Sequence, residues 1–134
     1  NLLKDDGLFL LHTIGVVDNP TPPNKFINKY IFPGGACPSF SQIIKPIEKT
    51  GLIVSDTETL IRHYDKTLES WLQRFLDQKN LVKDLFDEKF VKMWEFYMAS
   101  CAAAFRYRDL VVFQLQIVKN FQSAHRTRDY IYKT

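Results

Sequence analysis

A histidine near the end of an apolar segment is the first residue of this 134-residue chain that could do chemistry. The continuous apolar run around His12, bounded by Asp6-Gly7 and by Gly15, predicts a buried strand over residues 8–14. His12 lies near the carboxyl end of this strand, where parallel α/β folds place functional side chains. The same position also suits a hydrogen-bonded core histidine, which is the more common case, so the residues alone leave both interpretations open.

Tyr64 is the second candidate, and it lies just before an apolar pattern of helical period. It is flanked by His63, which we leave unassigned, and by Asp65, a residue type that often caps helices. Taken alone, these three residues indicate a helix start rather than a site.

Cofactor and metal motifs are not found. A nucleotide-type cofactor needs a glycine-rich turn between a strand and a helix. Gly34-Gly35 is the only adjacent glycine pair, but it follows the aromatic segment 26–32, so we interpret it as an ordinary turn. Cys37 and Cys101 are far apart, without a CxxC motif, which argues against zinc and a disulfide framework and favours reduced thiols. We therefore expect no metal ligands and no cofactor-binding residues in this chain.

The elements that must position these residues follow an α/β pattern. The proline-rich segment 16–25 predicts an exposed, mobile loop. A capping box of Ser39 and Gln42 predicts a helix that ends near Gly51, and Pro46 predicts a kink or two short pieces. We expect a short second strand over 52–54, a third strand over 110–118 whose latter half alternates apolar and amide residues, and a polar, basic tail over 120–134.

Two long amphipathic helices are predicted between the second and third strands. The second of them is capped by Asp87. Their apolar stripes are Leu68, Trp71, Leu72, Phe75 and Leu76, and then Phe90, Trp94, Tyr97, Met98, Cys101 and Phe105.

Composition limits the class of protein. A formal charge of +3 without a Lys/Arg run argues against nucleic acid, and no apolar run approaches the ~18–20 residues of a membrane span. Three strands make a thin sheet, typical of one side of a doubly wound sheet. Residues 1–4 look like the last turn of a helix, so we expect the chain to begin inside a domain and residues 1–134 to form one partial domain.

Five sequence blocks together carry a family resemblance. They are LHTIG at 11–15, INKYIFPGG at 27–35, HYDKTL at 63–68 with Trp71 following, FVKMWEFY at 90–97 and AFRYRDL at 104–110. In this order and spacing the chain closely resembles the carboxyl-terminal half of the cyclopropane-fatty-acyl-phospholipid synthases, which are S-adenosylmethionine-dependent methyltransferases.

The resemblance implies a Rossmann-like, seven-stranded class I methyltransferase fold with strand order 3-2-1-4-5-7-6. The three strands here would be the fifth, sixth and seventh, with their helices. The edge of the strand over 8–14 that should meet the fourth strand would then be bare, which predicts a homo-oligomer formed through this edge.

The resemblance also implies a chemistry. The family transfers the methyl group of S-adenosylmethionine to a cis double bond in a phospholipid acyl chain, and a bound bicarbonate acts as the base during ring closure. His12, Ile14 (through its backbone) and Tyr64 match the bicarbonate-binding positions, which makes His12 and Tyr64 the catalytic candidates. The family's cofactor loop and its glutamate and cysteine partners of bicarbonate lie upstream and are not in this chain, and Cys37 does not match that cysteine.

The implied partner is a phospholipid acyl chain at a membrane surface, which suggests a cytoplasmic bacterial enzyme in peripheral contact with the inner membrane. We expect Tyr30, Phe32 and Trp71 to line the acyl pocket. The remaining aromatic residues of the helical stripes are assigned to the core.

Two classes of function stay open. The chain could be the carboxyl-terminal portion of a cyclopropane-forming lipid methyltransferase, or of a related methyltransferase with another acceptor. Alternatively, it could be a truncated, non-catalytic remnant that acts as a self-associating module. We expect the 134 residues alone to lack the S-adenosylmethionine site and activity.

Overall fold

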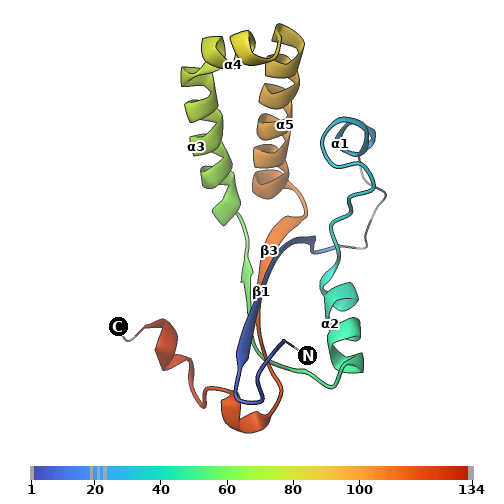
Figure 1. Ribbon diagram of the computed structural model, residues 1–134, viewed down its shortest axis with the longest axis vertical. Helices are drawn as coiled ribbons and strands as arrows, with labels where there is room; N and C mark the ends of the chain where they lie inside the picture. The colour runs from blue at the N-terminus through green and yellow to red at the C-terminus, as the bar shows by residue number, and fades with distance from the viewer. Residues whose placement is uncertain (1, 19, 21, 23, 133–134) are drawn as a thin grey trace.

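One three-stranded sheet organises the molecule. The computed structural model describes residues 2–18, 20, 22 and 24–132. The strands are β1 (Leu8–Val16), β2 (Ile53–Leu60) and β3 (Leu110–Val118), and their order in the sheet is β1-β3-β2. The central strand β3 pairs antiparallel with both neighbours, so β1 and β2 run in the same direction at the two edges (Figure 1). The first and third segments are strands, as predicted. The prediction that the first strand is buried was wrong, because β1 lies at the edge of the sheet and Leu8, Phe9 and Leu10 are exposed.

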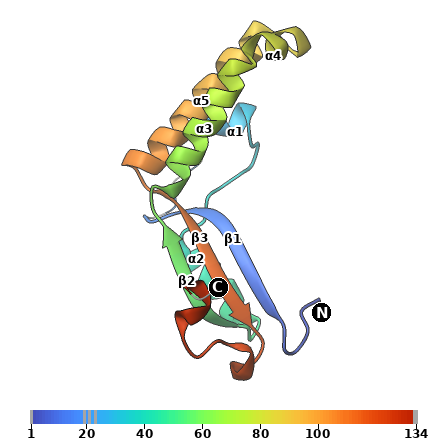
Figure 2. The ribbon, with the colours of Figure 1, turned by 90° about the vertical axis from the view of Figure 1, so that its left-hand side faces the viewer.

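The helices divide into a long hairpin and shorter pieces around the sheet. Figures 1 and 2 show the hairpin of α3, α4 and α5 standing at one end of the sheet, with α4 at its tip, α1 beside α5, and the carboxyl-terminal turns at the opposite end. The helices are α1 (Lys25–Tyr30), α2 (Phe40–Lys49), α3 (His63–Asp77), α4 (Lys79–Leu85), α5 (Glu88–Tyr107) and the short 3-10 turns η1 (Phe121–Ser123) and η2 (Arg128–Ile131).

The sheet buries β3 on both faces. Side chains of successive strand residues point to opposite faces, and four alternate residues of β3 pack with Ile43 of α2: Val111, Phe113, Leu115 and Ile117. On the other face, Val112 packs with Leu68, Ala102 and Phe105 at the base of the helical hairpin. β3 is therefore the central element of both cores.

The predicted helix caps are confirmed. Ser39 and Gln42 form the capping box at the start of α2. The side chain of Asp87 accepts a hydrogen bond of 2.6 Å from the backbone N–H of Phe90 at the start of α5.

Several predicted boundaries were wrong. The second strand is not confined to residues 52–54 but extends to Leu60, because its polar residues pair with β3 in register while their side chains lie near the surface. α2 runs through Pro46 as one helix, since this exposed proline removes a single N–H from the solvent side. Residues 2–4 are not helical, and Gly7 instead closes a turn onto the Lys4 carbonyl oxygen.

The aromatic segment around Phe26 forms α1, a helix that the sequence analysis did not assign. Its cap is Asn24, whose side-chain oxygen accepts a 2.8 Å hydrogen bond from the N–H of Phe26. The predicted loop over 16–25 includes residues 19, 21 and 23, and the predicted tail over 120–134 includes residues 133–134. These residues lie outside the described part of the chain.

Candidate functional site

Rows of facing residues cross the sheet from the middle of β1 toward its carboxyl end. His12 of β1 lies opposite Gln114 of β3, which in turn lies opposite Glu58 of β2. On the same face, the next row toward the helical hairpin consists of Ile14, Val112 and Leu60. Residues paired across antiparallel strands project to the same face. His12 and Ile14 therefore share the sheet face on which the hairpin packs.

His12 is tied to the central strand by a hydrogen bond. Its Nδ1 lies 3.0 Å from Nε2 of Gln114, and the His12 side chain is exposed. His12 is thus a surface residue in the middle of β1. The prediction that it lies near the carboxyl end of its strand was wrong, because pairing with β3 continues as far as Val16. The alternative of a buried core histidine does not describe its position.

Tyr64 reaches the same face of the sheet from the first turn of α3. Its ring is half-buried and packs on the cluster that contains Val112. Its centroid lies 5.2 Å from that of Phe105 and 5.8 Å from that of Trp71. Because Val112 is the register partner of Ile14, the structure brings Ile14 and Tyr64 to one region of one face. His12 is one row further along that face.

The start of α3 is anchored by a buried ion pair. Asp65 is 5% exposed and accepts a 3.0 Å hydrogen bond from Nε of Arg106 on α5, and Glu69 is a second partner of this guanidinium. The hydrogen bond from Arg106 lowers the pKa of Asp65, and its carboxylate partners, Glu69 first, raise the pKa of Arg106. The prediction that Asp65 caps the helix was wrong: Arg62, with φ of 64°, holds the N-cap position, and Asp65 lies inside the first turn.

The three aromatic residues expected to line a pocket do not form one group. Trp71 contacts Tyr64, whereas the Phe32 ring lies 6.2 Å from that of Tyr97 on α5. Tyr30 packs against Phe26 and lines a groove of about 340 Å³ between α1 and α5. Trp71, Phe32 and Tyr30 are 41%, 56% and 48% exposed, so all three present ring surface outward.

Tyr97 is the most electrostatically perturbed phenol of this region. Burial, with the neighbouring Cys101 thiol, raises the pKa of Tyr97 to about 12. Burial also raises the pKa of both Cys101 and Cys37, and both are free thiols. A raised pKa disfavours the thiolate, which is the nucleophilic form of cysteine.

The Gly34-Gly35 pair is a turn, as predicted, and does not fit a cofactor phosphate or carboxylate. Gly34 has φ of 75°, its N–H donates to the side chain of Asn28, and the N–H of Gly35 donates to the Phe32 carbonyl oxygen. Both N–H groups are therefore satisfied within the turn.

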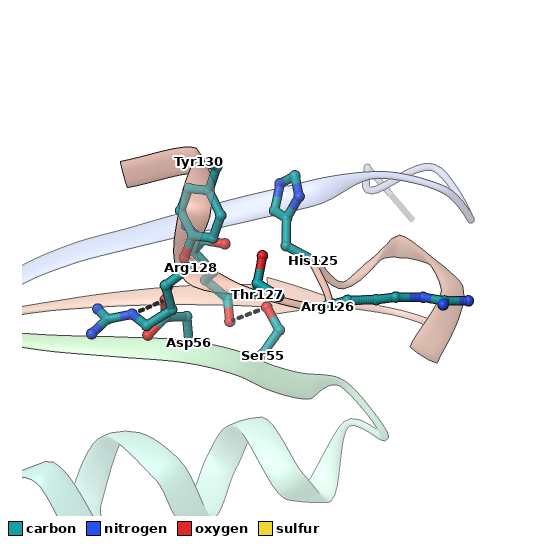
Figure 3. A pocket seen from close by; sticks show the side chains of 8 residues that line it. Ser55, Asp56, His125, Arg126, Thr127, Arg128 and Tyr130 are labelled. Carbon is teal, nitrogen blue, oxygen red and sulfur yellow. Dashed lines mark hydrogen bonds and ion pairs between the residues drawn. The ribbon is translucent and has the colours of Figure 1, made fainter. Parts of the chain in front are cut away.

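A polar cavity of about 170 Å³ lies where the carboxyl-terminal segment crosses β2 and β3 (Figure 3). Asp56 accepts hydrogen bonds from Nε of Arg128, at 2.8 Å, and from the Tyr130 hydroxyl. Burial opposes ionisation of Asp56, but the hydrogen bonds from Tyr130 and Arg128 outweigh it and lower its pKa. The His125 ring stacks on the Tyr130 ring, with 4.5 Å between the ring centroids. The polar groups of this cavity hold the chain's own carboxyl-terminal segment on the sheet.

Comparisons with known proteins give the family. A family model described as mycolic acid cyclopropane synthetase matches residues 1–115. The chain belongs to this family. Cyclopropane-fatty-acyl-phospholipid synthase of Escherichia coli K12 is 37% identical over 124 residues, which are 92% of this chain and 32% of the relative. A probable fatty acid methyltransferase of Pseudomonas putida is 35% identical over 140 residues, 98% of this chain and 36% of the relative. The chain spans about a third of the length of these relatives.

Solved structures agree with the family. The cyclopropane synthase MmaA2 of Mycobacterium tuberculosis has a TM-score of 0.78 at 28% identity, covering 87% of this chain and 45% of that one. The mycolic acid cyclopropane synthase CmaA1, complexed with SAH and CTAB, has a TM-score of 0.74 at 29% identity, covering 83% and 44%. The resemblance inferred from the five sequence blocks is confirmed, as is an α/β methyltransferase-like fold.

Two residues of the candidate site were not predicted from the sequence. Gln114 had a signal, because the alternation of apolar and amide residues in the third strand placed it on the less buried face. Arg106 had none, since its partner Asp65 lies 41 residues away in the chain.

Metal sites and membrane spans are two further features to consider. Among the described residues, no group of three or more histidine, cysteine or acidic side chains could hold a metal ion. Their helices also include none that is long and apolar enough to cross a bilayer.

Proposed function

We propose that this chain forms the acceptor side of an S-adenosylmethionine-dependent lipid methyltransferase of the cyclopropane-forming type. The whole enzyme would transfer a methylene group to a cis double bond of a phospholipid acyl chain at a membrane surface, on the cytoplasmic side of the inner membrane. The observation that carries the proposal is the placement of His12 and Ile14 on the sheet face against which Tyr64 packs, in a chain of this family.

The strand order supports the position of this chain within the seven-stranded fold. The order β1-β3-β2, with β3 antiparallel to both neighbours, is the order expected for the fifth, seventh and sixth strands. In that position the outer edge of β1 would meet the fourth strand. The exposed Leu8, Phe9 and Leu10 of this edge strand would be covered there.

The donor set suits a small anion such as bicarbonate. The His12 ring N–H, the backbone of Ile14 and the Tyr64 hydroxyl would hold it, and the bound anion would supply a base close to a reacting acyl chain. The aromatic rings of Trp71 and Phe105 pack against the Tyr64 ring and support its position. The proposal assigns S-adenosylmethionine to another part of the enzyme, because the Gly34-Gly35 turn already uses both of its N–H groups.

A related reaction at another acceptor is the second candidate. Sphingolipid C9-methyltransferase 2 of Gibberella zeae is 30% identical over 131 residues, 94% of this chain and 25% of that relative. The product distinguishes the two candidates, because a cyclopropane-forming enzyme closes a ring and a C-methyltransferase leaves a methyl branch.

A chimera tests the proposed function. The matching carboxyl-terminal part of the E. coli cyclopropane-fatty-acyl-phospholipid synthase is replaced by this chain and expressed in cells that lack their own synthase. Gas chromatography with mass spectrometry of the fatty acid methyl esters should show cyclopropane acids. His12→Ala should reduce them by roughly 10²-fold or more, while the matched control His125→Ala should not. A folded chimera without product, or with product independent of His12, would contradict the proposal.

A further inference from the structure

We propose that Gln114 is the positioning residue for His12, and that its amide selects the imidazole tautomer with the proton on Nε2. This inference rests on the proposed function, in which His12 donates a hydrogen bond to an anion beside β1. Gln114 itself touches neither the anion nor the acyl chain in this proposal.

The hydrogen-bond chemistry of the pair defines the tautomer. Nε2 of Gln114 lies 3.0 Å from Nδ1 of His12, and an amide nitrogen can only donate. Nδ1 must then be the acceptor, so a neutral imidazole carries its proton on Nε2. The hydrogen bond made by one ring nitrogen thereby makes the other nitrogen a donor.

Gln114 is held in a fixed position from which it can select the His12 tautomer. It lies on β3, which is paired along both sides, and its neighbour Leu115 is 0% exposed. His12 lies on an edge strand with an exposed side chain. The central strand therefore supplies a fixed reference for a ring that would otherwise be free to choose between rotamers.

The amide has a specific advantage over an acid at this position. Glu58 occupies the third place in the row, on the far side of Gln114. A carboxylate at position 114 would accept from Nδ1–H of His12 and reverse the tautomer, and it would also put two acids side by side. With glutamine on the central strand, the nearest carboxylate in this row is that of Glu58, which lies on the other edge strand.

Nitrogen NMR of the full 134-residue chain, labelled at its three histidines, tests the proposal. The His12 signals are assigned by their loss in His12→Ala. In the unsubstituted chain, Nε2 of His12 should show the chemical shift of a protonated ring nitrogen and Nδ1 that of an unprotonated one. In Gln114→Glu the proton should move to Nδ1.

Gln116→Glu is the matched control, since it makes the same change two residues along the same strand, opposite Leu10. It should leave the His12 tautomer unchanged. A proton on Nδ1 in the unsubstituted chain would overturn the proposal, and this outcome does not depend on the folding of Gln114→Glu. An unchanged tautomer in a folded Gln114→Glu chain would overturn it as well.

The same substitution in the chimera gives the functional readout. Gln114→Glu should lower kcat by about 10-fold or more with little change in KM, because the tautomer affects proton transfer rather than lipid binding. The NMR measurement needs no turnover. An inactive chimera would therefore count against the proposed function alone, and the tautomer would still decide the role of Gln114.

Discussion

Arg106 on α5 donates from Nε to Oδ2 of Asp65 on α3 across 3.0 Å, and this contact lies one residue after Tyr64. It joins the two long helices at their base, where both meet the sheet (Figure 2). The placement of the candidate site residue Tyr64 therefore depends on an ion pair between segments distant in sequence.

Loss of this ion pair should destabilise the fold in a pH-dependent way. The hydrogen bond from Arg106 lowers the pKa of Asp65 below its ordinary value of 3.8, so the unfolded chain takes up this proton at a higher pH than the folded chain. The contribution of Asp65 is present above pH 3.8 and is lost as the pH falls below it.

Asp65→Asn should therefore lower the midpoint of thermal unfolding at pH 7 by roughly 5 °C, and this difference should shrink at pH 3. Differential scanning calorimetry at both pH values measures it. Asp84→Asn, at an exposed position on α4, is the control and should have little effect. An equal effect of Asp65→Asn at pH 7 and pH 3 would show that the ion pair does not stabilise the fold.

Tyr64→Phe separates the hydroxyl group of Tyr64 from its ring. The ring contacts with Phe105 and Trp71 should persist, so the thermal midpoint of the chimera should change little. Cyclopropane formation should fall by roughly 10²-fold, the usual effect of removing one hydrogen-bond donor from a reacting anion. Tyr107→Phe, at an exposed position on α5, is the control. Full activity of Tyr64→Phe would reduce Tyr64 to a packing residue.

The open edge of β1 should make the isolated chain self-associate. Leu8, Phe9 and Leu10 are 42%, 46% and 52% exposed on this edge strand, and such edges pair with other chains. Light scattering coupled to size-exclusion chromatography should give a mass above 15.7 kDa. Leu10→Lys should shift the mass toward the monomer, whereas Leu85→Lys on α4 should not. A monomeric chain before any substitution would contradict this prediction.

The isolated chain should not bind S-adenosylmethionine. The glycine pair that could approach an anionic group already uses its N–H groups within a turn. Isothermal titration calorimetry of the 134 residues with S-adenosylmethionine should therefore give no heat of binding beyond dilution, and the chimera titrated in parallel should bind. Micromolar binding by the isolated chain would place a cofactor site within it.

Short-range sequence patterns predicted the elements that have a clear apolar run or a helix cap. The apolar runs gave β1 and β3, and Ser39 and Asp87 gave helix starts, because each depends on neighbouring residues. β2 was predicted too short because Asp56 and Glu58 weaken its apolar pattern, and only pairing with β3 keeps them in the strand. α1 was not assigned because six residues carry too little helical periodicity.

The site could be predicted only residue by residue. His12 was a candidate because it lies near the end of the predicted strand over residues 8–14. Tyr64 became a candidate only through the family resemblance. The contacts of His12 with Gln114 and of Asp65 with Arg106 span 102 and 41 residues, and no local pattern encodes them. Strand register and the crossing of α3 with α5 determine these partners.

The most direct test of the account is the lipid product of the chimera between this chain and the amino-terminal part of the E. coli enzyme. Cells that express the chimera should contain cyclopropane fatty acids. The amount of these acids should fall almost to zero in His12→Ala and should stay unchanged in His125→Ala. A well-folded chimera that binds S-adenosylmethionine but forms no cyclopropane or methyl-branched acid would contradict the account. The chain would then be a folded module of this family without its chemistry.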